Sequence, residues 1–144
     1  MLGAHVMGHV CISEAKMRYL KSFLAAGLLA FASPAAAQQL IGAYTAFIGT
    51  DDLYNSKGAR LTQPWQVLRQ DRANYHRYGI RQVGDEWDPF FGNVDNRAAM
   101  ERMIMNGSMD PVARQNLLQG GATVFVRIYG SGGIGRYVDV TVAR

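Results

Sequence analysis

Apolar and polar residues alternate most regularly near the C-terminal end of the chain. Residues 123–129 carry a branched apolar side chain at every second position, and the same alternation returns in residues 137–143. A period of two predicts β-strands with one buried face. The glycine-rich residues 131–135 lie between them and predict a hairpin. When the valine faces are aligned, Arg127 lies opposite Asp139, which is a favourable cross-strand pair.

A third strand is predicted near the start of the domain, over residues 43–49. Tyr44, Ala46 and Ile48 fall on one face of this strand. An isolated hairpin is only marginally stable in water, so we expect the first strand to join the C-terminal hairpin in one antiparallel sheet. Residues 51–58 follow with the Asp, Asn, Ser and Gly content of a turn.

Helical spacing begins after this turn. Thr62 can cap a helix that has Pro64 in its first turn, and Gly79 is suited to the position after its last turn. Trp65, Leu68, Arg72 and Tyr75 lie at helical spacing and share one face of this helix.

Two further helices are predicted between this helix and the hairpin. The first is capped by Asp95, covers residues 96–106 and presents Ala99, Met100, Met103 and Ile104 to the core. The second opens at Asp110-Pro111, closes at Gly120 and turns Val112, Leu117 and Leu118 inward. The sequence therefore predicts an α+β fold. A small antiparallel sheet, made of the N-terminal strand plus the C-terminal β-hairpin, has two or three helices packed on one face.

Residues 17–37 have the three parts of a cleavable secretory signal peptide. A short basic segment (17–21) precedes an uncharged apolar run (23–32), and Ala35, Ala36 and Ala37 supply the small-residue cleavage pattern. The alternative, a membrane-spanning helix, needs about 20 apolar residues, and this run is far shorter. We expect cleavage after Ala37 and a protein that is periplasmic or extracellular, with no stable membrane insertion.

Met17 stands where the initiator of a signal peptide normally stands. Residues 1–16 are therefore either a mis-called start or an unusually long first segment of the signal. His5, His9 and Cys11 have the chemistry of soft-metal ligands, but they leave with the signal. We accordingly predict no metal site, no cofactor and no disulfide in the mature chain.

Removing 37 of the 144 residues leaves 107, which is the size of one domain. The signal takes three basic residues and one acidic residue with it, so the formal charge falls from +4 to +2. The remaining arginines are scattered among carboxylates, whereas nucleic-acid binding needs a clustered basic face. We therefore predict no nucleic-acid partner.

Gly130, Gly132 and Gly135 match the G-x-G-x-x-G spacing of dinucleotide-binding turns. That motif works because the turn leads into a helix whose N-terminus holds the pyrophosphate. Here the turn leads into a strand, so we interpret the glycines as a hairpin loop.

Acidic residues gather in the irregular segment between the first two helices. Asp85, Glu86 and Asp88 offer oxygen ligands of the kind that calcium prefers, although their spacing does not fit an EF-hand loop. The competing interpretation is a loop in which these side chains cap helices and form turns. A calcium-stabilised structural module therefore stays as an alternative.

His76 is the one histidine in residues 38–144 and lies one helical turn after Arg72. It can act as a general base only if a nucleophile and an orienting carboxylate reach it from elsewhere. Together with Arg72 it can instead bind an anion. A small hydrolase that uses His76 with a carboxylate from residues 85–88 is therefore an alternative function.

Trp87 lies in the same segment and is followed by Phe90 and Phe91. These aromatics either cover one end of the core or form a recognition surface. The main prediction is a small exported, non-catalytic module that binds an unidentified protein or cell-envelope ligand. Its expected binding residues are Arg72, His76, Asp85, Trp87 and Asp88.

Overall fold

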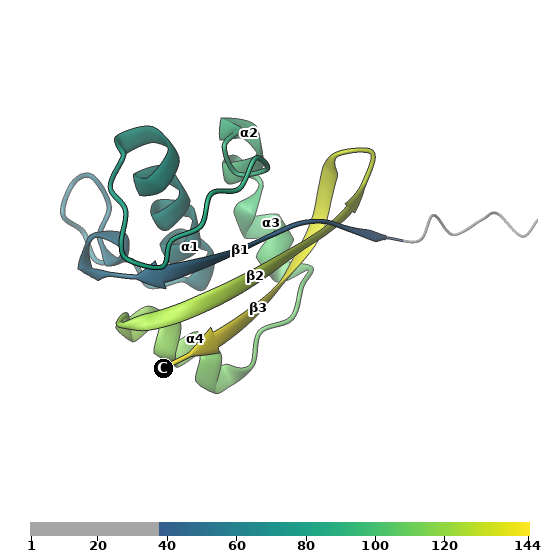
Figure 1. Cartoon of the computed structure of the whole chain (residues 1–144). Helices are drawn as coiled ribbons and strands as arrows, with labels where there is room; N and C mark the ends of the chain where they lie inside the picture. Colours follow the sequence, from purple (N-terminus) through teal and green to yellow (C-terminus); the bar gives the residue numbers. More distant parts are fainter. Residues whose placement is uncertain (1–37) are drawn as a thin grey trace, which may run out of the picture. The chain divides into compact units, whose positions relative to one another are not determined.

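A computed structural model describes residues 38–144, and the predicted signal peptide with His5, His9 and Cys11 lies outside the described residues. The sheet is antiparallel, with the order β1-β2-β3 (Figure 1). Its strands are β1 (Gln39–Ile48), β2 (Ala122–Ser131) and β3 (Ile134–Ala143). The predicted α+β class, with an N-terminal strand and a C-terminal hairpin in one sheet, is confirmed.

The register of the hairpin follows the alignment of the valine faces. Val126 pairs with Val140 and Arg127 pairs with Asp139, as the alternation predicted. On the face that carries Arg127, the Tyr129 and Tyr137 rings stack with their centroids 4.8 Å apart. Because one buried face fixes the register, a slip by one residue would turn every valine towards water.

The first helix, α1 (Pro64–Ala73), continues through a wider π-helical turn, Asn74–Tyr78, and ends at Gly79, whose φ of 69° is left-handed. The predicted cap at Thr62 is wrong. Gln63 is the capping residue, and the Gln66 side chain accepts the N–H groups of Thr62 and Gln63, both at 3.1 Å.

The predicted second helix is divided into α2 (Val94–Ala98) and α3 (Met100–Met105). The cap of α2 is Asn93, whose side chain accepts the N–H of Asp95 at 2.7 Å, so the predicted cap at Asp95 is wrong. The division allows Arg97 to donate to the carbonyls of residues 91 and 92 while Met100 and Met103 are buried in the core.

The last helix, α4 (Pro111–Gln119), begins as predicted. The Asp110 side chain accepts the N–H of Val112 at 2.8 Å and that of Ala113 at 3.3 Å. Leu117 is fully buried, but Val112 lies in the first turn and is largely exposed, so its predicted place in the core is wrong.

The core lies between one face of the sheet and the helices. Alternate residues of all three strands are buried, and their neighbours on the opposite face are more exposed. The chain passes very close to β3 at Gly107, where a Cβ atom would lie 1.7 Å from the carbonyl oxygen of Val138. Within residues 38–144 no helix has the length and hydrophobicity needed to cross a bilayer. The main buried apolar side chains are Tyr44, Ile48, Val67, Leu68, Phe91, Met100, Met103, Leu117, Val124, Val126, Ile128 and Val138.

Candidate functional site

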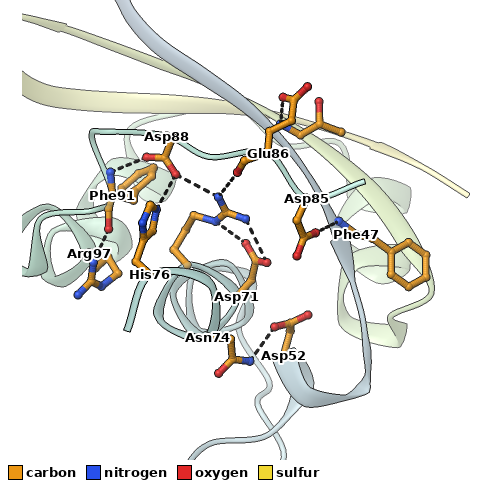
Figure 2. A network of polar contacts seen from close by, with 12 residues as sticks. Phe47, Asp52, Asp71, Asn74, His76, Asp85, Glu86, Asp88, Phe91 and Arg97 are labelled. Atoms are coloured by element: carbon orange, nitrogen blue, oxygen red, sulfur yellow. Dashed lines mark hydrogen bonds and ion pairs between the residues drawn. The ribbon is translucent and has the colours of Figure 1, made fainter. Parts of the chain in front are cut away.

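Arg72 is the centre of a buried polar network, whose partners Asp71 and Asp88 are labelled in Figure 2. Its Nε donates to Asp71 Oδ2 at 2.8 Å, and its Nη1 donates to Asp88 Oδ2 at 3.0 Å. Nη1 also donates to the carbonyl oxygen of Glu86 at 2.9 Å. A fully buried guanidinium needs this kind of compensation, because an unpaired charge in the interior is very unfavourable.

Two aromatic rings complete the surroundings of Arg72. The guanidinium carbon lies 4.1 Å from the centroid of the Tyr44 ring and 4.8 Å from that of Tyr75. Arginine stacks on aromatic faces more readily than lysine does, because its planar cation is weakly hydrated. Leu68, Arg72 and Tyr75, which the helical spacing placed on one face, are all buried.

Asp71 is buried beside Arg72 and is perturbed by that burial. Loss of solvent raises the pKa of Asp71 from 3.8 to about 7, although the adjacent Arg72 cation and its hydrogen bond act to lower it. Burial also raises the pKa of Asp52, whose carboxylate accepts a hydrogen bond from Asn74 Nδ2 at 2.8 Å. Burial thus favours the protonated form of both carboxyl groups, because the interior solvates the ionised form poorly.

Asp88 connects His76 to this network. His76 Nε2 lies 3.0 Å from Asp88 Oδ2, the same oxygen that accepts from Arg72, and Asp88 Oδ1 accepts the N–H of Phe91 at 2.6 Å. The sequence predicted that Arg72 and His76 could hold an anion together. In the structure both side chains contact the carboxylate of Asp88, which is an anion supplied by the chain itself.

Asp85 is near this network but its hydrogen bonds go to backbone N–H groups outside it. Asp85 accepts the N–H groups of Phe47 and Gln82, both at 2.8 Å. The structure therefore joins three of the five predicted binding residues, Arg72, His76 and Asp88, by direct polar contacts. Asp85 is bound to the backbone instead, and Trp87 is exposed.

The role of Asp85 is shared by Glu86, which binds the outer edge of β1. The Glu86 side chain accepts the N–H of Thr45 at 2.7 Å, and the Glu86 N–H donates to the Thr45 carbonyl at 2.8 Å. Figure 1 shows the segment between α1 and α2 running alongside β1. An unpaired strand edge invites pairing with other chains, and these contacts cover part of that edge.

The acidic residues considered as calcium ligands thus each bind different groups of the protein. Within residues 38–144 no three His, Cys, Asp or Glu side chains gather in a way that could hold a metal ion. Asp85 binds backbone N–H groups at the edge of β1, while Asp88 serves Arg72, His76 and Phe91.

Sequence reasoning missed Asp71, Asp52, Asn74 and Arg97 as members of the buried polar set. Asp71 is not on the helix face of His76, but its adjacency to Arg72 was a usable signal. Asp52 and Asn74 are far apart in sequence, and no local pattern indicates that they meet.

The aromatic group of the joining segment is divided by the fold. Phe91 is fully buried and contacts Tyr44 edge to face, with centroids 5.9 Å apart, and Phe90 is partly buried. Trp87 is 65% exposed. Phe91 thus covers the core, whereas Trp87 is exposed to solvent.

Trp87 is one of four exposed large apolar residues at positions 78–87, a stretch that starts at the last residue of the π-helical turn. Tyr78, Ile80 and Val83 are also exposed, Val83 completely. We refer to residues 78–87 as the 78–87 loop. A hollow of about 360 Å³ lies beside it and is lined by Tyr54, Tyr78 and Ile80 together with polar residues.

Comparisons with known proteins identify no relative. No family model, no curated protein and no solved structure matches the chain. The function is therefore argued from the residues themselves.

Proposed function

We propose that residues 38–144 form an exported, non-catalytic module that binds a protein or another cell-envelope component through the 78–87 loop. The observation that carries this proposal is the exposure of four large apolar side chains within ten residues of one loop. Two of them, Tyr78 and Ile80, line one hollow with Tyr54, and contiguous exposed apolar surface indicates an interaction site.

The loop is held in place by polar contacts while its apolar side chains face solvent. The Ile80 N–H donates to the Asn74 carbonyl at 3.0 Å, and the Arg81 guanidinium lies 4.4 Å from the centroid of the Tyr75 ring. Residues 82–85 form a turn in which the Asp85 N–H donates to the Gln82 carbonyl at 3.2 Å.

Gly84 occupies the third position of this turn with a φ of 97°, a conformation that suits glycine. Val83 is therefore presented at a fixed tip. A contact surface that is already ordered loses little conformational entropy on binding.

Export is the part of the proposal that rests on sequence. The basic, apolar and small-residue segments of residues 17–37 support it, and the proposed mature protein begins at Gln38. Mass spectrometry of the exported protein is expected to give a chain that starts at or near Gln38. A chain that retains Met17 would contradict export by signal cleavage.

A hydrolase is the second candidate, because His76 and Asp88 do meet, at 3.0 Å. However, the same Asp88 oxygen also binds Arg72, and both carboxylate oxygens of Asp88 are engaged. Among the described residues Asp88 is the single side chain that hydrogen-bonds to His76, so no hydroxyl is positioned as a nucleophile. The pair is better suited to joining α1 to the segment that leads to α2.

Site-specific photocrosslinking in the producing cell tests the loop. A photoreactive phenylalanine is placed at Val83, and the control is the same residue at Val112, an exposed apolar position on α4. We expect a discrete crosslinked product from position 83 and none from position 112. Equal products from both positions, or none from position 83, would contradict the proposal.

A further inference from the structure

A second feature, separate from the 78–87 loop, is a hollow of about 500 Å³ beside the start of β3. α3 packs on β3 in this part of the fold (Figure 1). The hollow is lined by residues from three parts of the chain: the residue before β1, the end of α3, and the first residues of β3. Its polar lining consists of Gln38, Arg102, Asn106, Arg136 and Tyr137.

The charge in this hollow is entirely positive. Arg102 and Arg136 are both exposed, and neither lies within 4.0 Å of a carboxylate of residues 38–144. The acidic side chain nearest in sequence is Glu101, which lines a neighbouring hollow together with Arg102 and Met105. Arg72 differs, because two carboxylates already bind it.

The walls of the hollow belong to well-supported parts of the fold. Asn106 Nδ2 donates to the Arg136 carbonyl at 3.4 Å and so links the end of α3 to β3. At Gly135 a Cβ atom would lie 2.5 Å from both Met103 Cε and Phe90 Cζ, so the backbone there rests directly on the core. Sites on rigid elements hold their side chains more accurately than sites on free loops do.

We propose that this hollow binds the phosphate group of a ligand, with Arg102 and Arg136 as its charged contacts. Guanidinium groups bind phosphate oxygens through paired hydrogen bonds, and the amide side chains of Gln38 and Asn106 can add neutral donors. The volume is in the range of small-molecule sites. No carboxylate lines the hollow to repel an anion.

The phosphate can come from a soluble phosphate ester or from a phospholipid headgroup. Ile134, which also lines the hollow, is an exposed apolar residue that could contact a lipid chain. Both sources present the same chemistry to the arginines, and the experiment distinguishes them.

Isothermal titration calorimetry of the purified protein with glycerol 3-phosphate tests the soluble source. We expect saturable binding that weakens about tenfold in Arg102→Gln and in Arg136→Gln, because each loses a charge-assisted contact. The matched control is Arg114→Gln, an exposed arginine on α4 outside the hollow, which should bind as the wild type does. Both tested arginines are exposed, so their melting temperatures should not change.

Sedimentation with phosphatidylglycerol vesicles, with phosphatidylcholine vesicles as the reference, tests the lipid source. Binding of either ligand that depends on Arg102 and Arg136 supports the site and identifies its source. Absence of binding in both assays, or an equal loss in Arg114→Gln, would overturn it. Val83→Ser should leave both assays unchanged, so failure of this site and failure of the 78–87 loop are separate results.

Discussion

Substitution of Asp88 by alanine should be among the most damaging single changes in this domain. The carboxylate accepts from Arg72 at 3.0 Å, contacts His76 at 3.0 Å and accepts the N–H of Phe91 at 2.6 Å. Removing one partner of a buried ion pair costs about 3–5 kcal/mol, because the other charge stays buried. The unpaired Phe91 N–H adds about 1 kcal/mol. Small domains have about 5–15 kcal/mol of stability in total, so the variant should lose a large share of it.

Urea unfolding followed by far-ultraviolet circular dichroism measures this loss. Asp88→Asn is the informative companion, because it keeps an acceptor for the Phe91 N–H but loses the charge, and it should fall between Asp88→Ala and the wild type. Asp95→Asn is the control: Asp95 is exposed, and its change should stay within about 0.5 kcal/mol. A loss below about 1 kcal/mol in Asp88→Ala would refute the reasoning that Asp88 compensates a buried cation.

Three further predictions follow from individual contacts. Burial raises the pKa of Asp71 to about 7, so its contribution to stability is complete below its ordinary pKa of 3.8 and is lost as the pH rises through 7. Between about pH 5 and pH 7, the free energy of unfolding measured by urea titration should therefore fall less steeply in Asp71→Asn than in the wild type, by about 1 kcal/mol per pH unit. Parallel curves for the two proteins would contradict this. Asp85→Ala should cost about 1–3 kcal/mol and cause concentration-dependent association in light scattering, because the edge of β1 loses an acceptor, whereas Asp51→Ala, at an exposed side chain, should do neither. Gly107→Ala should lower the free energy of unfolding by more than about 2 kcal/mol, because the new Cβ atom clashes with β3. Gly133→Ala should lower it by about 1 kcal/mol, because Gly133 has a left-handed φ but open space around it. Equal melting temperatures of the two variants would show that the backbone relaxes at Gly107.

The sheet could be predicted because its information is local. Alternation in residues 122–143 fixes which side chains are buried, and the shared valine face then fixes the register. Asp110 and Pro111 predicted the start of α4 for the same reason, since capping depends on residues within one turn. The division between α2 and α3 has no comparable local signal, because an uninterrupted helical pattern runs through Ala99.

The candidate site could be predicted only in part. The spacing of Arg72 and His76 is a property of one helix, and in the structure both side chains contact Asp88. Which carboxylate reaches them depends on the path of the loop, so Asp85 and Asp88 could not be told apart by sequence. Exposure of Trp87 and burial of Phe91 likewise depend on tertiary packing, which composition and spacing do not encode.

The central claim is that contact with a partner occurs at the surface of the 78–87 loop and not at the buried network. The most direct test measures the yield of the crosslinked product from position 83 in cells, with and without Trp87→Ser. Trp87 is largely exposed, so this change should leave the melting temperature unaltered while the product is lost or strongly reduced. An undiminished product in Trp87→Ser, at equal expression and stability, would contradict the assignment of the 78–87 loop as the contact surface.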